Sequence, residues 1–186
     1  MTTPEPAMTE PVADEPVVDR HRRRVCLWTL AGVALGAVIL DRLAKAWVVA
    51  ELQPRIESGE GPIVLLGGLL KFTYVENTGA AFSIGAGYTW IFSIVAVVVA
   101  VVIVRTSRRL GSIWWAIALG GLLGGLLGNL IDRLTRPPSF GLGYVVDFIQ
   151  LPNFAVFNVA DMFITCSAVL MVILALRGIE LSGGRG

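Results

Sequence analysis

Four long apolar runs constrain this chain more than any other feature of its 186 residues. They cover residues 25–50, 88–104, 111–134 and 153–176. A run of roughly 20 apolar residues can cross the hydrocarbon core of a bilayer as one α-helix. Only 16% of the residues are charged, whereas soluble domains have about a quarter. The sequence therefore predicts an all-α membrane protein with four transmembrane helices.

The two ends of the chain differ in composition from these runs. Residues 1–24 begin with a proline-rich acidic stretch and end in an arginine cluster, so we expect a disordered acidic tail and a basic flank. A cleaved signal peptide would have a shorter apolar run and a small-residue cleavage site, so residues 25–50 are interpreted as a span. Residues 178–186 are expected to form a short tail.

Residues 51–87 form a polar, turn-rich insert between the first two runs. Within it, residues 63–66 and 69–75 are β-prone and flank Gly67 and Gly68. A two-residue glycine connection between such runs favours a β-hairpin. Apolar and polar residues alternate in the second run, so one face of the hairpin is apolar. We expect the hairpin to lie on the bilayer surface.

Lys and Arg residues are distributed unevenly over the connections, and they favour the cytoplasmic side of a membrane. Nine flank the ends that four spans place on one side: Arg20, Arg22, Arg23, Arg24, Arg105, Arg108, Arg109, Arg177 and Arg185. Three lie in the 51–87 and 135–152 loops: Arg55, Lys71 and Arg136. Both termini are therefore expected in the cytoplasm and both large loops outside.

Polar residues inside the spans gather near the predicted external ends. They are Asp41 and Lys45 in the first span, Asn129, Asp132 and Arg133 in the third, and Asn158 and Asp161 in the fourth. At about 1.5 Å per residue, Asp41 and Asp161 both lie on the order of 12 Å inside those ends. Spacings of three or four residues place each set on one helix face. Three helices thus bring polar groups to one depth.

Each of these sets also has a purely structural interpretation. Asp41 and Lys45 could form a neutralised ion pair, and Asp132 and Arg133 could anchor the helix at the interface. Asn158 and Asp161 could make a helix-packing hydrogen bond. Glycines at four-residue intervals in the third span, such as Gly124 and Gly128, predict close helix packing around them.

Two carboxylates, Asp147 and Asp161, are the candidates for catalysis. The only histidine lies among arginines and the two cysteines show no ligand spacing, so no metal site and no cofactor is predicted. No feature indicates a nucleic-acid partner. Two close carboxylates cannot both ionise cheaply, so one keeps a proton. One could then deprotonate a water while the other protonates a scissile carbonyl oxygen, as in aspartic proteases.

Five motifs, in order along the chain, resemble the lipoprotein signal peptidases (signal peptidase II) of bacteria. They are residues 41–45 (DRLAK), 77–83 (NTGAAFS), 124–133 (GGLLGNLIDR), 145–148 (VVDF) and 157–161 (FNVAD). The resemblance covers about residues 25–177 and implies one four-helix peptidase domain. It also implies that the insert 51–87 is an external β-cradle that helps to clamp substrate.

The resemblance implies an intramembrane aspartyl endopeptidase of the bacterial cell membrane, which we expect to act as a monomer with its site near the external face. Its substrates would be prolipoproteins carrying diacylglycerol on the lipobox cysteine, cut just before that cysteine. Asp147 and Asp161 match the catalytic pair, and globomycin-type peptides would occupy the site. The candidates for lining or shaping the site are Asp41, Lys45, Asn77, Gly79, Asn129, Asp132, Arg133, Asn158 and Ala160.

Two other functions remain as alternatives at this point. Intramembrane Asp, Lys and Asn residues also mark ion paths, so a small proton-coupled transporter is the main rival. Against it, the four spans show no internal repeat and the polar groups cluster at one end. A structural scaffold with buried ion pairs would leave Asp147 and Asp161 without a role. The connection between Arg133 and Asp147 is longer than the family pattern, which predicts reshaped external loops.

Overall fold

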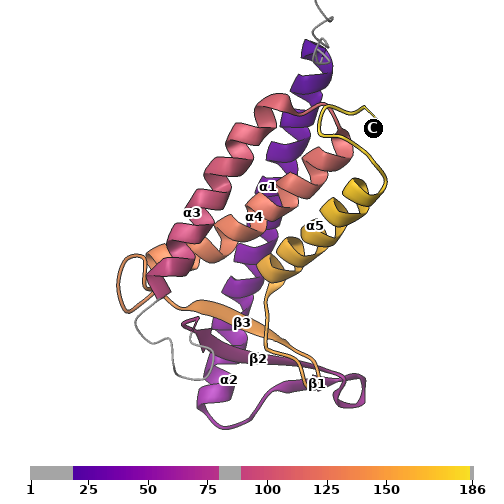
Figure 1. Cartoon of the computed structure of the whole chain (residues 1–186). Coiled ribbons are helices and arrows are strands. Elements are labelled where there is room, and N and C mark those ends of the chain that lie inside the picture. The colour runs from indigo at the N-terminus through magenta and orange to yellow at the C-terminus, as the bar shows by residue number, and fades with distance from the viewer. Residues whose placement is uncertain (1–18, 80–88, 185–186) are drawn as a thin grey trace, which may run out of the picture.

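The computed structural model describes residues 19–79 and 89–184 (Figure 1). Within these ranges, four helical segments are long and apolar enough to cross a membrane. They are built on α1 (Arg20–Trp47), α3 (Thr89–Thr106), α4 (Ile113–Thr135) and α5 (Val159–Leu176). The prediction of four transmembrane helices is confirmed. Most of the predicted acidic tail, and residues 80–83 of the NTGAAFS motif, lie outside the described residues.

The first span continues further than the sequence predicted. After α1 the chain passes through a π-helical turn, Val48–Leu52, into α2 (Gln53–Glu57), so the helical segment extends from Arg20 to Glu57. Val48 and Leu52 are fully buried in a cluster with two residues of a neighbouring strand, Val146 and Phe148. This contact keeps the chain helical where the polar insert was expected to begin.

A three-stranded antiparallel sheet lies across one end of the helices (Figure 1). Strands β1 (Ile63–Leu65) and β2 (Leu70–Asn77) form the predicted hairpin. Gly67 and Gly68 connect them with φ angles of 65° and 98°, a region that glycine enters without steric cost.

The third strand, β3 (Val145–Gln150), comes from the connection between α4 and α5 and pairs with β2. From the sequence alone, this segment is predicted to be part of an external loop. Its first four residues are all buried, including Val146 and Phe148 beside α1. A strand buried on both faces lacks the alternation by which half-buried strands are identified.

The fourth span begins six residues later than predicted, at Val159 rather than at residue 153. The apolar residues before it run alongside β3, where Phe157 and Ile149 exchange two backbone hydrogen bonds of 3.0 and 2.8 Å. Asp161 therefore lies in the first turn of α5, roughly 3 Å from its start at 1.5 Å per residue. The predicted depth of 12 Å for Asp161 is wrong, because hydropathy alone cannot separate an apolar strand from an apolar helix.

Glycines let α4 pack closely against α1 and α5, as predicted. A Cβ atom added at Gly124 would lie 2.6 Å from the Ala34 carbonyl oxygen of α1. At Gly125 it would lie 2.5 Å from the Ala160 carbonyl oxygen of α5. Contacts this short are possible only without a side chain. The glycines of α4 therefore bring α1, α4 and α5 close together, and these are the three helices that carry the polar site residues.

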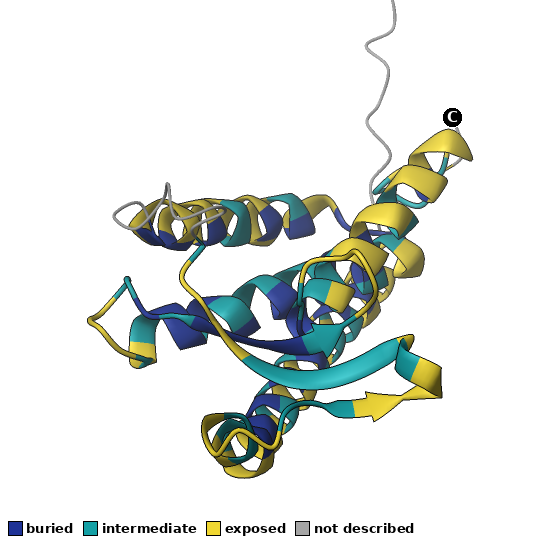
Figure 2. Cartoon of the chain, turned by 90° about the horizontal axis from the view of Figure 1, so that it is seen from below, coloured by how far each residue is buried: buried dark blue, intermediate teal, exposed yellow. Residues whose placement is uncertain are grey.

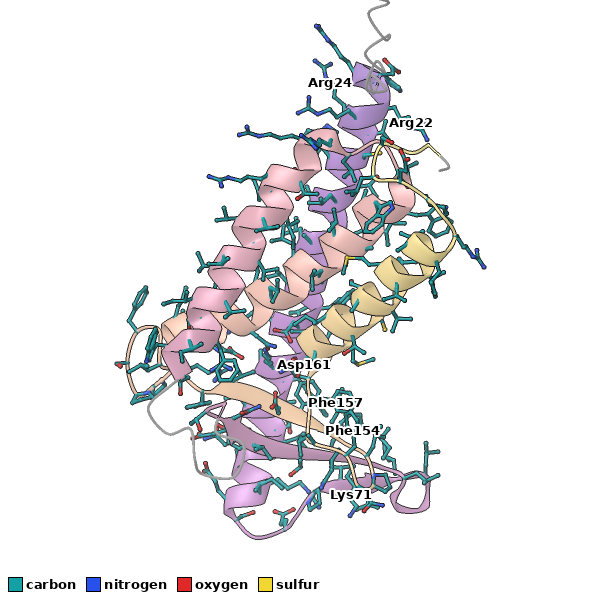
Figure 3. All side chains as sticks on the ribbon, viewed as in Figure 1. Arg22, Arg24, Lys71, Phe154, Phe157 and Asp161 are labelled. Atoms are coloured by element: carbon teal, nitrogen blue, oxygen red, sulfur yellow. The ribbon has the colours of Figure 1, made fainter. Side chains whose placement is uncertain are left out.

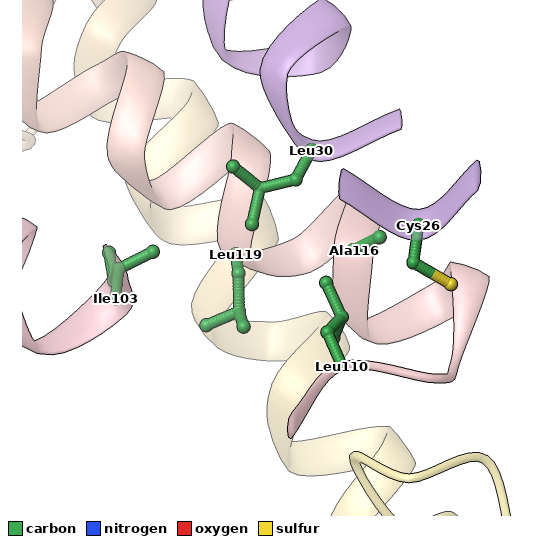
Figure 4. Packing of buried hydrophobic residues seen from close by; sticks show 6 residues of the cluster. All are labelled: Cys26, Leu30, Ile103, Leu110, Ala116 and Leu119. Carbon is green, nitrogen blue, oxygen red and sulfur yellow. The ribbon is translucent and has the colours of Figure 1, made fainter. Parts of the chain in front are cut away.

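The end of the bundle away from the sheet is held by a small apolar cluster (Figure 4). Its members come from α1, α3, α4 and the α3–α4 connection: Cys26, Leu30, Ile103, Leu110, Ala116 and Leu119. The first turn of α1 and the segment after α5 lie at this same end (Figure 1). Exposed residues cover the outward faces of the helices (Figure 2), as expected for surfaces that face lipid.

Candidate active site

The polar residues of the spans meet where α1, α4 and α5 reach the sheet. Figure 3 shows Asp161 at this boundary, at the end of α5 nearest β3. Asp147, the other predicted catalytic residue, lies on β3 and is only 2% exposed. The two carboxylates thus come from a strand and from a helix N-terminus.

Asp147 is fixed by two side-chain amides. Its Oδ2 accepts a hydrogen bond of 2.7 Å from Asn77 Nδ2, and its Oδ1 accepts one of 2.6 Å from Asn158 Nδ2. Burial is the main cause that raises the pKa of Asp147 to about 6; the nearby charge of Asp161 acts in the same direction, and the two amides oppose the shift. Asp147 is therefore a carboxyl group that titrates close to neutral pH.

Asp161 is fixed by a capping box at the start of α5. Its backbone N–H donates to Asn158 Oδ1 at 3.0 Å, and its Oδ2 accepts from the Asn158 backbone N–H at 3.1 Å. Its second oxygen, Oδ1, accepts a 2.8 Å hydrogen bond from Asn129 Nδ2. The helix N-terminus also favours a negative charge at this position.

Asn158 joins the two carboxylates. It is fully buried, caps α5 through Asp161, and donates to both Asp147 and Asn129 Oδ1, the latter at 3.1 Å. The i,i+3 spacing predicts that Asn158 lies inside a helix on the same face as Asp161, whereas in the structure it precedes the helix as its cap. Its position as the cap leaves its amide free to reach across to β3.

Lys45 sets the orientation of Asn129. Its fully buried ammonium contacts Asn129 Oδ1 at 2.9 Å, Asp41 Oδ2 at 2.8 Å and Asp132 Oδ2 at 2.9 Å. An ammonium can only donate hydrogen bonds, so Asn129 must present its oxygen to Lys45. Its NH2 group is then left to face Asp161.

Asp41 connects α1 to the first turn of α5. Its Oδ1 accepts a hydrogen bond of 3.0 Å from the backbone N–H of Ala160. This bond shows that Asp41 and Asp161 lie at one level, as predicted, although not at the predicted depth. Ala160 is fully buried, and a Cβ atom at Gly128 would lie 3.3 Å from its methyl group. A small side chain is therefore required at residue 160.

Asp132 bonds to groups other than the two candidate catalytic residues. Its Oδ1 accepts from Arg42 Nη1 and, at 2.9 Å, from Arg136 Nε. Its Oδ2 accepts from the Val146 N–H at 3.4 Å as well as from Lys45. Asp132 therefore ties α4 to α1 and β3. Arg42 and Arg136 are not among the site residues predicted from the sequence, although Arg136 follows Asp132 at the i,i+4 spacing that places two residues on one helix face.

Arg133 leaves α4 in another direction. Its guanidinium lies over the Phe92 ring of α3, 5.1 Å from the centroid, and the charges of Asp147 and Asp161 act on it. The prediction that Asp132 and Arg133 share one face is wrong, because consecutive residues on a helix point about 100° apart. Among the described residues, the buried Nη1 atom of Arg133 has no hydrogen-bond partner.

Gly79 completes the cluster beside Arg133. Its N–H donates to Asn77 Oδ1 at 2.8 Å, which turns the Asn77 NH2 group towards Asp147. The φ angle of Gly79 is 79°, and an added Cβ atom would lie 2.7 Å from the Phe92 ring. Both the backbone conformation and the space require glycine here.

One hydrogen-bonded and charged cluster therefore contains all the predicted site residues. Within residues 19–79 and 89–184, no group of three or more His, Cys, Asp and Glu side chains is arranged to hold a metal ion. The cluster offers instead two carboxylates in unequal environments, backed by amides and one buried lysine. Such a pair can pass protons to and from a water and a bound carbonyl group.

Comparisons with known proteins agree with the motifs. A family model described as signal peptidase (SPase) II matches residues 33–177. A lipoprotein signal peptidase of Rhodococcus jostii is 45% identical over 89% of this chain and 79% of its own length. One from Streptomyces coelicolor is 48% identical over 88% of this chain and 77% of its own length.

Two solved structures, both described as a bacterial membrane enzyme, share this fold. They are 26% and 27% identical to the chain, with TM-scores of 0.66 and 0.68. Each covers 81% of this chain, and the chain covers 88% and 94% of them. The residues that the family model matches include the positions of Asp147 and Asp161. This multi-pass membrane protein therefore belongs to the signal peptidase II family, the lipoprotein signal peptidases.

Proposed function

We propose that the chain is an intramembrane aspartyl endopeptidase in which Asp147 and Asp161 act together on a water molecule. The observation that carries this proposal is that one residue, Asn158, binds both carboxylates. Its side-chain amide donates to Asp147 of β3, and its backbone N–H donates to Asp161 of α5. A scaffold would not need to bring a strand carboxylate against a helix-capping carboxylate. The pairing supports shared proton chemistry.

In the proposed mechanism the pair starts with one proton, held on Asp147. This assignment is supported by the burial of Asp147 and by its pKa of about 6. Asp161 takes a proton from water as the water oxygen attacks the scissile carbonyl carbon, and Asp147 gives its proton to the carbonyl oxygen. Asp147 then recovers a proton from the resulting diol while Asp161 protonates the leaving nitrogen. The C–N bond breaks, and the pair returns to its starting state.

The proposed substrates are prolipoproteins with diacylglycerol on the lipobox cysteine, cut just before that cysteine. The names of the relatives support lipoprotein precursors as the substrate class. The location of the cluster supports the lipid requirement, because it lies where membrane helices meet an extramembrane sheet. A peptide bond held next to an acylated cysteine would lie at this depth.

We further propose that both termini are cytoplasmic and that the candidate site lies near the external face. Lys and Arg residues are more numerous around the end that carries Arg22 and Arg24, which is far from Asp161 (Figure 3). A monomer is sufficient for this function, because every residue of the cluster belongs to one chain.

The test is cleavage of a diacylated lipobox peptide by purified variants. Asp147→Asn and Asp161→Asn are each expected to reduce cleavage to background while the protein still folds. Glu57→Gln, at an exposed position of α2, is the matched control and should cleave normally. Full activity in either aspartate variant would refute the catalytic pair. A transporter would instead show ion-dependent flux in liposomes without cleavage.

A further inference from the structure

The sheet ends in an apolar surface that no described part of the chain covers. We call this surface the apolar tip. It comprises six large side chains from the β1–β2 hairpin and from the segment after β3, between 39% and 73% exposed: Val64, Leu65, Leu66, Leu69, Leu151 and Phe154. Contiguous exposed apolar surface on an extramembrane element marks an interaction site.

The turn at the apolar tip places leucine where water would favour a polar residue. Leu66 is 73% exposed and has a φ angle of 49°, a region usually occupied by Gly, Asn or Asp. Leu69, at the other end of the turn, is 63% exposed. A turn exposed to bulk water gains nothing from either side chain.

The position of the apolar tip relates it to the lipid-facing surface of α5. In Figure 1 the β1–β2 turn lies below the first turn of α5 and to one side of it, and Figure 2 shows this end as exposed. Figure 3 shows Phe154 and Lys71 at this end of the molecule, and both line one hollow beside the sheet. Met162 and Val172, on α5 itself, are 47% and 58% exposed and belong to a membrane span.

The distribution of charged residues around the apolar tip suits contact with a membrane surface. Residues 61–75 and 148–157 contain no Asp or Glu, and Lys71 is their only charged residue. A hollow of about 380 Å³ lies between Lys71, Gln150 and Phe154, so a cation and an aromatic ring face one space. Aromatic and leucine side chains beside a lysine are typical of the membrane interface. By contrast, exposed charged residues, Glu57 and Glu60, surround the α2 end of the insert.

We propose that the apolar tip inserts into the interfacial layer of the same bilayer that the helices cross, and so holds the sheet against the membrane. Phospholipid is the partner, because the helices of the same chain are built to cross a bilayer next to the sheet and the apolar tip carries no negative charge. Leu66, Leu69 and Phe154 would lie among the upper acyl segments, while Lys71 remains at headgroup level. This contact does not depend on the proposed catalytic mechanism.

The test uses spin labels on the full-length protein in liposomes of phosphatidylcholine with a minority of phosphatidylglycerol. Cysteines are introduced one at a time as Leu66→Cys and Phe154→Cys, with exposed Cys166 replaced by alanine and buried Cys26 retained. Ser58→Cys, at an exposed position near α2, is the water control, and Val172→Cys on α5 is the lipid control. Retained peptidase activity shows that each labelled protein is folded.

Labels at residues 66 and 154 are expected to resemble the label at 172, with severalfold more collisions with oxygen than with a water-soluble nickel complex. The label at 58 should show the reverse. Nickel accessibility at 66 and 154 equal to that at 58 would place the tip in water and overturn the proposal. Labels that neither reagent reaches would indicate a protein partner, or a second copy of the chain, and would overturn it as well.

Discussion

Asn158 donates its side-chain amide to Asp147 at 2.6 Å, and through this bond the first turn of α5 holds a carboxylate of β3. The same residue accepts the Asp161 N–H as the helix cap. One side chain therefore combines a stabilising role with a positioning role. The two roles use different atoms, because Oδ1 makes the cap and Nδ2 makes the bond to Asp147. A substitution can separate them.

Asn158→Ser is expected to keep the cap and lose the bond to Asp147. Serine is a good cap residue, so the midpoint of thermal unfolding should change little, whereas kcat should fall roughly 100-fold through misplacement of Asp147. Asn158→Ala should lose the cap too, with a further cost of about 1 kcal/mol in stability. Thermal unfolding and single-turnover cleavage measure the two effects. Wild-type kcat in Asn158→Ser would contradict the positioning role.

The pH dependence of cleavage should reflect Asp147. In the proposed mechanism Asp147 must carry the proton, and its pKa is about 6 because burial and the charge of Asp161 raise it from 3.8. The value of kcat/KM should therefore fall as pH rises through about 6, by roughly tenfold per unit above it. Substrate binding removes water and raises this pKa further, so the fall in kcat should lie at higher pH than the fall in kcat/KM.

The variant Asn77→Ala provides a separate check that the fall in kcat/KM follows the pKa of Asp147. The Asn77 amide donates to the charged form of Asp147 and lowers its pKa, so its removal should move the fall in kcat/KM upwards, by up to about one pH unit. Tyr74→Phe removes a hydroxyl bonded to Glu76 and Tyr144 and should leave the profile unchanged. A downward movement in Asn77→Ala would show that Asp147 is not the proton carrier.

The sequence was sufficient to predict the four spans and to identify the residues of the candidate site. It was not sufficient to predict the hydrogen bonds and ion pairs between those residues. Residues 41, 129 and 161 belong to apolar helices, where a polar group is conspicuous. β3 was missed because its pairing with β2 joins residues about 70 positions apart, as in the bond between Asn77 and Asp147. No local periodicity carries that information.

The remaining errors of the sequence-based prediction concern where the helices begin and which residues contact one another between helices. Residues 153–157 are apolar enough to extend the fourth span, yet Phe157 pairs with Ile149 of β3, and only then can Asn158 act as a cap. The pairing of Asp41 with Lys45 followed from i,i+4 spacing. The contacts of Lys45 with Asp132 and Asn129 cross between helices, so they depend on the glycine-mediated approach of α4 to α1.

Lys45→Met is expected to destabilise the protein strongly. It leaves Asp41 buried without its charged partner, which costs roughly 3–5 kcal/mol, whereas Asp132 keeps Arg42 and Arg136. The double variant Asp41→Asn with Lys45→Met should recover much of this loss, because the uncompensated charge is gone. Unfolding in mixed detergent micelles measures the difference.

The control for Lys45→Met is Arg55→Met, which removes a cation whose ion pair with Glu60 is exposed. Exposed pairs contribute under about 1 kcal/mol, so this variant should unfold close to the wild type. Equal losses in the two variants would mean that the buried charges are not energetically coupled.

Gly124→Ala should separate α4 from α1. The added methyl carbon would meet the Ala34 carbonyl oxygen and the Ala37 Cβ atom, each at 2.6 Å, and a backbone carbonyl cannot move unless α1 moves. Overpacking of this kind costs about 1–3 kcal/mol. Because α1 also carries Asp41 and Lys45, the displacement should weaken the contact with Asn129 and reduce kcat together with stability.

Gly32→Ala is the matched control on α1, because, apart from its chain neighbours and the adjacent backbone of its own helix, no atom of the described residues lies within 4 Å of the position its Cβ would take. Alanine is favoured over glycine in a helix by about 1 kcal/mol, so this variant should be as stable as the wild type or slightly more so. Unfolding midpoints in detergent, with cleavage rates on the same samples, compare the two. If Gly124→Ala matched Gly32→Ala in both, close contact between α1 and α4 would not be what holds the cluster in place.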